Sequence, residues 1–339
     1  MRLLKKLYEI SSPSGKEKAM RKFIKSLLTG MKVDYTEDKH GNIYATKGES
    51  DTYPCLVCHT DEVHRVRKKG YRIVESEGLI FGINDITKSF EGIGADDKNG
   101  IWVCIKALSE FDVLKCAFFV SEEIGCVGSR SADMKFFEDC RFVAQCDRKG
   151  NSDFITKASG TELCSSEFIK AACLKQFGYK EEHGLMTDVM TLKENGLSVS
   201  ACNISCGYYN PHTGNEMTNI SDLYNCYRLV RHLVNNCTDV YPHEYVPVCK
   251  GYKGYGGLNY DYYKYGSNTS KWLYEDDDWD YNSYESEYDQ MFQEMYNYAK
   301  DNENFSVKTF ISLYGSKYKY LELADYEFAC EDILGIIER

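Results

Sequence analysis

The feature that most constrains this chain is an alternation of short apolar runs with amphipathic segments over the first two-thirds of its 339 residues. Apolar runs bounded by turn residues predict buried strands, and the longer segments have the spacing of helices. This alternation indicates an α/β fold in which helices are layered on a sheet. The predicted strands are 33–35, 42–46, 53–59, 116–120, 142–146 and 199–204, with a hairpin at 71–74 and 79–83; the predicted helices are 3–9, 16–29, 98–111, 167–177, 188–195 and 221–236.

Polar side chains follow the apolar runs at the points where the predicted strands end. His59 ends one run, Glu123 and Asp147 follow two others, and His212 follows a fourth after a turn. Asp96 stands just before a predicted helix. In an α/β sheet the binding site lies beyond the carboxyl ends of the strands. We therefore expect these five side chains to meet at one edge of the sheet.

The five residues are imidazoles and carboxylates, a ligand set that suits zinc. One carboxylate can bridge two metal ions, which leaves a histidine and a carboxylate for each ion. Two neighbouring ions can clamp a hydrolytic transition state and activate a shared water. Asp61, two residues beyond His59, is placed to fix the imidazole tautomer. Glu122 is placed to act as general base and then to protonate a leaving amine.

Each of these residues also fits a structural role. An aspartate before Lys98 can cap a helix, just as Ser14 has the capping-box spacing to Glu17 at the start of the helix 16–29. Adjacent glutamates such as Glu122 and Glu123 are typical of a solvated face. The whole set, in this order and at successive strand ends, favours a functional site over these separate roles.

The candidate residues stand within short motifs: His59–Val63, Gly94–Gly100, Ser121–Gly125, Asp147 and Pro211–Glu216. Taken together, these segments resemble the co-catalytic di-zinc exopeptidases, the clan that includes peptidase T and the leucyl- and glutamyl-aminopeptidase-like enzymes. The GADDKxG and PHTxNE forms are most similar to the peptidase T-like branch. The resemblance covers about residues 1–237, and Thr187–Asp188 and Ser12–Gly15 also fit it.

The resemblance implies a role for each metal-capable residue. His59 and Asp147 would hold one zinc ion, Glu123 and His212 would hold the other, and Asp96 would bridge both. Cobalt and manganese are the alternative metals. No expected position is substituted, which argues against an inactive relative.

The resemblance also implies the catalytic residues and the fold. Asp61 would orient His59, and Glu122 would be the general base and acid. The implied fold is a three-layer α/β/α catalytic domain with a mixed central sheet. The implied activity is that of a cytoplasmic metallopeptidase that removes N-terminal residues from short peptides. A deacylase or carboxypeptidase on the same core is the nearest alternative, and a binding or scaffold protein with a vestigial metal site is the non-enzymatic one.

The spacing of the motifs departs from many members of that clan, which carry an inserted lid or dimerisation domain. Only 34 residues separate Asp61 from Asp96, and only 64 separate Asp147 from His212. Predicted catalytic-domain elements fill the longer gap. We therefore expect a catalytic domain at 1–245 without a lid, followed by an extension of unknown fold at 246–339, and the oligomeric state stays open.

The C-terminal region differs in composition from the rest of the chain. Residues 275–303 hold eleven acidic side chains against the single basic Lys300, so the rest of the chain is close to neutral although the whole carries −11. Residues 251–300 hold twelve of the 28 tyrosines. The run Asp276–Asp278 lacks the spacing of an EF-hand loop. We expect a partly folded appendage, helical at about 287–300, that is a candidate to cover the active site in place of a lid.

Composition argues against several other classes. Net acidity argues against nucleic-acid binding, and no apolar stretch is long enough to span a membrane. The start of the chain lacks the apolar core of a signal peptide, so we expect the fifteen cysteines to be reduced thiols that pack as small hydrophobic residues.

Cys55-x-x-Cys58-His59 matches the c-type haem attachment pattern, but that chemistry usually follows export. The chain has no Gly-x-Ser-x-Gly nucleophile elbow.

Overall fold

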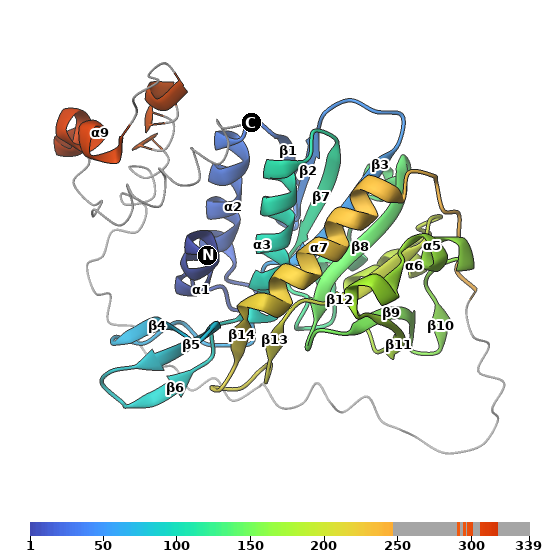
Figure 1. Cartoon of the computed structure of the whole chain (residues 1–339), viewed down its shortest axis with the longest axis horizontal. Helices are drawn as coiled ribbons and strands as arrows, with labels where there is room; N and C mark the ends of the chain where they lie inside the picture. The colour runs from blue at the N-terminus through green and yellow to red at the C-terminus, as the bar shows by residue number, and fades with distance from the viewer. Residues whose placement is uncertain (247–289, 292–293, 296, 301–305, 318–339) are drawn as a thin grey trace.

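The computed structural model describes residues 1–246, 290–291, 294–295, 297–300 and 306–317. Its centre is a nine-stranded sheet with the order β1-β2-β7-β3-β8-β12-β9-β10, in which β11 also pairs with β9 (Figure 1). The strands of this main sheet are β1 (Asp34–Glu37), β2 (Ile43–Lys47), β3 (Tyr53–His59), β7 (Leu114–Phe119), β8 (Cys140–Arg148), β9 (Asp153–Ala158), β10 (Thr161–Glu162), β11 (Lys180–Gly184) and β12 (Ala201–Ser205).

The four central strands of the main sheet are parallel. β3 runs parallel to β7 and β8, and β8 runs parallel to β12. β2 and β9 flank this group in the antiparallel direction, so the sheet is mixed as expected. Every residue of β3 and β7 is buried, as is typical of parallel strands covered on both faces. The carboxyl ends of the four strands therefore open on one edge of the sheet.

Helices cover both faces of this sheet, which confirms the three-layer architecture. Neighbouring residues of β8 point to opposite faces. The Gln145 amide oxygen accepts a 2.7 Å hydrogen bond from Thr187 at the head of α6 (Asp188–Glu194), whereas the Cys146 thiol lies against Cys226 of α7 (Ile220–Asn236). The layer that holds α7 also holds α3 (Ala95–Glu110), seen in front of the sheet in Figure 1. The remaining helices of residues 1–246 are α1 (Arg2–Glu9), α2 (Lys18–Gly30), α4 (Val127–Arg130) and α5 (Ser166–Ala171), with 3₁₀ turns at Met134–Phe137 and Leu174–Phe177.

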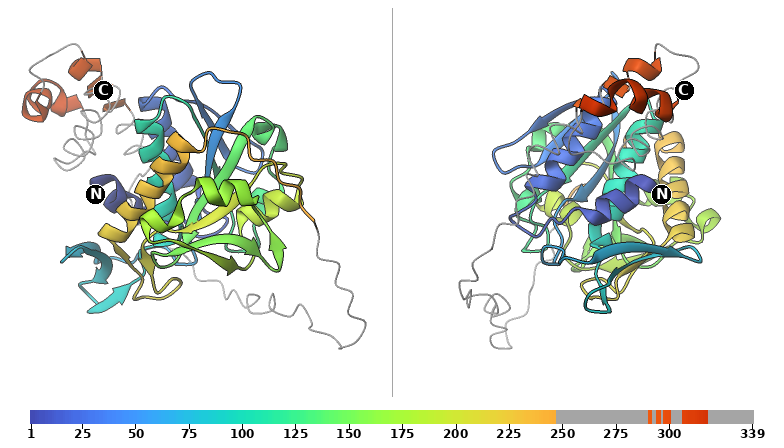
Figure 2. Two further views of the ribbon diagram at one scale, coloured as in Figure 1. Left: turned by 45° about the vertical axis from the view of Figure 1, so that its right-hand side comes forward. Right: turned by 90° about the vertical axis from the view of Figure 1, so that its left-hand side faces the viewer.

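A second, five-stranded sheet lies at one end of the body (Figure 2). It joins two segments that are far apart in the sequence, because β14 pairs with β5 through Met217 and Phe81. This pairing brings the chain that precedes Asp96 beside the chain that carries His212. Its strands are β4 (Tyr71–Ser76), β5 (Leu79–Asn84), β6 (Ser89–Glu91), β13 (Tyr208–Tyr209) and β14 (Met217–Asn219).

Three helical pieces are described beyond residue 246. Residues 290–291, 294–295 and 297–300 are helical, which confirms the predicted helix over that part. α9 spans Val307–Tyr314, and a 3₁₀ turn at Gly315–Lys317 follows it. The Tyr298 ring lies 5.8 Å from the ring of Phe310. The acidic run Asp276–Asp278 and the hypothesised cover lie outside the described residues. The division of the chain at 245/246 stays a prediction.

Two local predictions are wrong. Ser14 does not cap α2, since its hydroxyl donates a 2.6 Å hydrogen bond to Asp61 and the N-cap residue is Glu17, which makes no side-chain capping bond. The single helix predicted over 167–177 is interrupted at Cys173, whose φ of 48° is left-handed and incompatible with a continuous α-helix.

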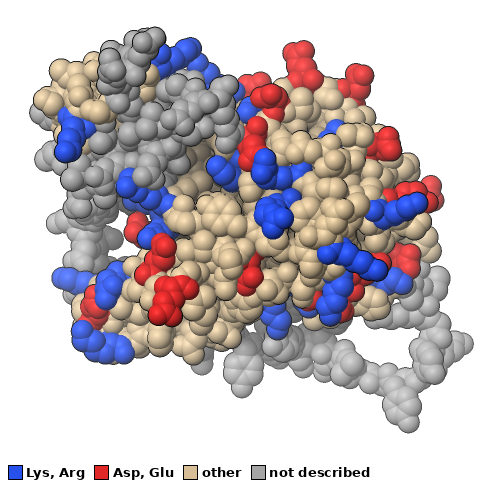
Figure 3. Space-filling view, viewed as in Figure 1, with Lys and Arg blue, Asp and Glu red and all other residues tan. Residues whose placement is uncertain are grey.

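The described residues also show how charge is distributed, whether a helix could cross a membrane and whether cysteines are bonded. On the face shown in Figure 3, basic and acidic side chains are interspersed over the described residues. Among the described helices, none has both the length and the apolar character that a membrane crossing requires. Every cysteine that the structure describes is a free thiol.

Candidate active site

Asp96 lies between the two imidazoles of the predicted cluster. Its Oδ1 lies 3.1 Å from His59 Nε2, and its Oδ2 lies 3.2 Å from His212 Nε2. The residue sits at the start of α3, beyond the end of β3, so each carboxylate oxygen faces a histidine from a different segment. A carboxylate in this position has the geometry of a bridge between two ligand groups.

His59 is the last residue of β3, and its side chain is 1% exposed. Its Nδ1 lies 3.1 Å from the Asp61 carbonyl oxygen, which can only accept, so the proton belongs on Nδ1. Nε2 faces Asp96 and, at 3.7 Å, Asp147 Oδ1. Burial favours a lower pKa for His59, but hydrogen bonds with these carboxylates and with Asp61 outweigh it and raise the pKa well above its usual value. With Nδ1 bonded to the carbonyl oxygen, Nε2 is the nitrogen that would bind a metal ion in place of its proton.

His212 completes a second group with Glu123. Its Nε2 lies 3.1 Å from Glu123 Oε1, and hydrogen bonds with Asp96 and Glu123 raise the pKa of His212 to about 10. The ligand-capable atoms of His59, Asp96 and Asp147 lie within 4.8 Å of one another, and the same holds for Asp96, Glu123 and His212. The structure thus brings the five residues together in two groups that share Asp96, while their role as metal ligands stays a prediction.

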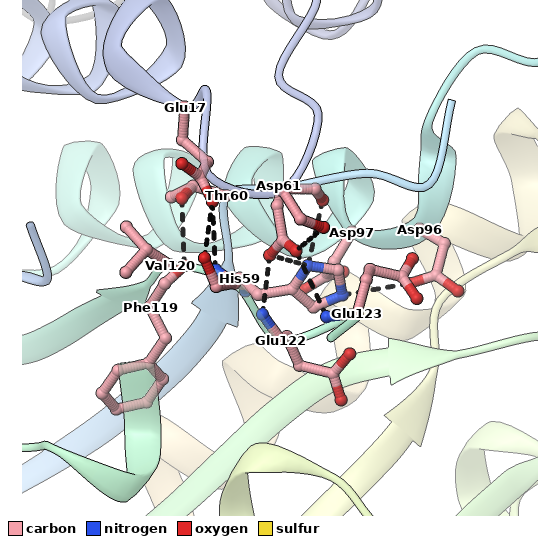
Figure 4. Close-up of polar contacts among 12 residues, drawn as sticks. Glu17, His59, Thr60, Asp61, Asp96, Asp97, Phe119, Val120, Glu122 and Glu123 are labelled. Atoms are coloured by element: carbon pink, nitrogen blue, oxygen red, sulfur yellow. Dashed lines mark hydrogen bonds and ion pairs between the residues drawn. The ribbon is translucent and has the colours of Figure 1, made fainter. Parts of the chain in front are cut away.

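Asp61 connects the end of β3 to the turn that carries the two glutamates (Figure 4). Its carboxylate accepts hydrogen bonds from the backbone N–H groups of Glu122, at 2.9 Å, and Glu123, at 3.2 Å, and from the Ser14 hydroxyl. Burial favours a higher pKa for Asp61, but its bonds with His59, Ser14 and Glu122 outweigh that effect and lower the pKa. Asp61 therefore stays ionised and fixes the turn that carries Glu122 and Glu123 relative to His59.

A cavity of about 320 Å³ opens beside this cluster. Glu122 faces it, and burial raises the pKa of its carboxyl to about 8. Beyond the acidic side chains and His212, the cavity wall is partly apolar and partly basic. The other lining residues are Arg148, Lys149, Ile155, Gly184, Leu185, Met186, Thr187, Asn203, Tyr208 and Pro211.

The donor set fits a pair of divalent cations. Four carboxylates from Asp96, Glu122, Glu123 and Asp147 face only two imidazoles across one small cavity. Burial and the neighbouring carboxylate of Asp96 raise the pKa of Asp147 well above its usual value, because negative charge exceeds positive charge in the cluster. Bound cations would supply the missing positive charge.

Three residues that hold Asp147 escaped the sequence analysis. Gln145 Nε2 donates to Asp147 Oδ2 over 3.1 Å, and the Tyr208 hydroxyl lies 3.3 Å from Oδ1. Asn203 Oδ1 accepts the Asp147 backbone N–H over 2.9 Å. Gln145 and Asn203 are polar residues inside otherwise apolar strands, and that interruption is the signal that could have identified them.

Comparisons with known proteins give a fold but no sequence match. No family model matches the chain, and no curated protein sequence matches it. Among solved structures, the chain is similar to aminopeptidase PepT from Bacillus cereus, with a TM-score of 0.57 and 16% identity, over 69% of this chain and 97% of that one. The chain has the fold of this peptidase. The resemblance drawn from the sequence motifs is therefore confirmed at the level of the fold.

Two further solved structures lead to the same conclusion. A tripeptidase from Staphylococcus aureus matches with a TM-score of 0.55 and 14% identity, over 69% of this chain and 97% of that one. An aminopeptidase from the archaeon Desulfurococcus kamchatkensis matches with a TM-score of 0.55 and 17% identity, over 68% of this chain and 93% of that one.

Proposed function

We propose that the chain is a metal-dependent aminopeptidase that acts on short peptides. The observation that carries this proposal is the position of Asp96, whose two oxygens each face one imidazole of a five-residue donor cluster. The peptidase fold supports it independently. A cavity of about 320 Å³ is at the lower end of ligand-site volumes and suits the end of a peptide better than a folded substrate.

The metal-binding residues of this proposal are those that the structure brings together. His59 and Asp147 would hold one zinc ion, Glu123 and His212 the other, and Asp96 both, with cobalt or manganese as alternative metals. Such ions supply Lewis-acid chemistry, since they polarise the scissile carbonyl and lower the pKa of water. Asp61 keeps the His59 proton on Nδ1 and so presents Nε2 as a ligand.

Glu122 is the proposed general base and acid. It faces the cavity next to Glu123, and Asp61 holds its backbone N–H. Burial raises the pKa of Glu122, and a carboxyl group whose pKa is moved toward neutrality can take a proton from the attacking water and return it to the leaving amine. The group that leaves is then a neutral amine, the form in which an amide nitrogen departs most readily.

Replacing the proposed base tests this function. Glu122→Gln should lower kcat by about 10²–10⁴-fold while the protein retains its metal, because positioned acid–base catalysis contributes that much. Glu162→Gln is a matched control, since that carboxylate pairs with Lys157 on the surface and is 63% exposed. Hydrolysis of free and N-acetylated di- and tripeptides by the metal-loaded protein, read by mass spectrometry, measures the effect. Near-normal turnover by Glu122→Gln, or equal cleavage of the acetylated peptides, would contradict the proposal.

A further inference from the structure

Glu216 ends the segment Pro211–Glu216 and is 1% exposed, yet the proposed function leaves it without a task. Its Oε2 accepts the Gly94 backbone N–H over 2.6 Å and lies 2.8 Å from His64 Nε2. Its Oε1 accepts the Asp96 backbone N–H over 3.2 Å. One buried carboxylate thus holds the backbone of the proposed bridging residue from a distant part of the chain.

The position requires a carboxylate and not an amide. Both oxygens of Glu216 face a backbone N–H, one from Gly94 and one from Asp96, and neither N–H can act as an acceptor. A glutamine here would turn its NH₂ group toward one of these donors. Leaving a buried donor without an acceptor costs more than the hydrogen bond itself contributes to stability.

His64 fixes Glu216 from the other side. Its ring packs directly on Gly92, where an added Cβ would lie 2.1 Å from the ring atom Cε1. Gly92 belongs to the connection between β6 of the smaller sheet and α3, and His64 belongs to the chain that leaves β3. The ring is therefore held in place. Its bond to Glu216 joins the chain that follows β3 to the chain that precedes β14, and its packing on Gly92 joins both to the connection that leads into Asp96.

We propose that Glu216 is a positioning residue, supported by His64, that sets the placement of the Asp96 carboxylate between the two imidazoles. This inference rests on the proposed function in one respect, since it takes Asp96 as the bridge between two metal ions. It adds that the smaller sheet has a functional role, because Glu216 directly precedes β14 and the Gly94 N–H that it accepts lies in the β6–α3 connection.

Measuring the zinc affinity of the folded, metal-free protein tests this inference independently of peptide hydrolysis. Zinc is titrated into wild type, Glu216→Gln and His64→Ala in competition with a chromophoric chelator. Residues that orient metal ligands typically contribute 10–100-fold to affinity, so we expect Glu216→Gln to weaken zinc binding by about that factor. We expect His64→Ala to weaken it less, because both backbone donors keep their acceptor. At saturating zinc, Glu216→Gln should lower kcat and leave KM near the wild-type value.

A control carboxylate in the same sheet separates positioning from stability. Glu91 lies in β6 and accepts a 2.9 Å hydrogen bond from Asn84, with no hydrogen bond to Asp96. Glu91→Gln should bind zinc as wild type does, and the thermal unfolding of all metal-free variants is measured alongside. Wild-type zinc affinity in folded Glu216→Gln, or an equal loss in Glu91→Gln, would overturn the inference. A wild type that binds no zinc would overturn the proposed metal site as well, whereas binding without peptide hydrolysis would overturn only the proposed activity.

Discussion

Asp188 is a fully buried carboxylate at the start of α6, close to the candidate site. Burial raises the pKa of Asp188 to about 6, although hydrogen bonds from Ser129, at 2.5 Å, and Gln145, at 3.2 Å, favour its ionised form. An acid whose pKa is higher in the folded state binds more protons when folded. The contribution of Asp188 to the free energy of unfolding therefore falls as the pH rises from about 4 to about 6.

Replacing Asp188 should remove this pH dependence. Asp188→Asn cannot ionise, so the metal-free variant should lose less stability than wild type between pH 4 and 6, by up to about 3 kcal/mol. Urea unfolding of both proteins at several pH values in a chelating buffer measures the difference. Asp112→Asn, at an exposed position before β7, is the control. Parallel pH profiles for Asp188→Asn and wild type would contradict the prediction.

Single residues were predictable where strand order fixes their position. The meeting of Asp96 with His59 follows from the strand-end rule, because α3 packs against β3 and begins near the carboxyl end of that strand. The bonds of Ser14 to Asp61 and of Glu216 to Asp96 were not predictable. They depend on side chains that meet across loops, and local spacing carries no signal for such contacts.

The segment after β3 is tied to α3 by buried charges. Glu62 is 1% exposed, and its two oxygens lie 2.9 Å from Lys98 Nζ and 2.7 Å from Arg67 Nη2. Burial favours a raised pKa for Glu62, but the charges of Lys98 and Arg67 outweigh it and lower the pKa. The ion pairs hold the loop that follows His59 against the helix that begins with the Asp96 segment.

Removing the central carboxylate should destabilise the fold. Glu62→Gln leaves Lys98 and Arg67 buried without their counter-charge, and breaking a buried pair in this way costs about 3–5 kcal/mol. Glu162→Gln breaks an exposed pair with Lys157 and should cost at most about 1 kcal/mol. Urea unfolding at neutral pH compares the two. A similar, small loss in both variants would show that the buried cluster contributes little.

Elements with strong apolar patterns were predicted almost to the residue. β3 spans Tyr53–His59 and α7 spans Ile220–Asn236, close to the predicted 53–59 and 221–236. β11, Lys180–Gly184, was not predicted because none of its five residues is buried, and an exposed polar strand has no alternating pattern. Its pairing with β9 is what makes it a strand.

At the scale of the whole molecule, the parallel centre of the sheet explains why a site forms. β3, β7, β8 and β12 end on the same edge, so His59, Glu123 and Asp147 converge although the last lies 88 positions after the first. The sequence order of strands and helices was enough to predict this convergence. The pairing of β14 with β5 was not predictable, because a three-residue strand that pairs with a partner more than 130 positions away carries no local signal.

Metal content is the most direct measure of the central claim that five side chains hold a pair of cations. Wild type, Asp96→Ala and Glu122→Gln are loaded with zinc, freed of excess metal by dialysis and analysed by elemental mass spectrometry. We expect about two zinc ions per chain in wild type and in Glu122→Gln, and far fewer in Asp96→Ala, which lacks the shared ligand. A folded wild type that retains less than one zinc ion per chain, or an Asp96→Ala variant that retains two, would contradict the account.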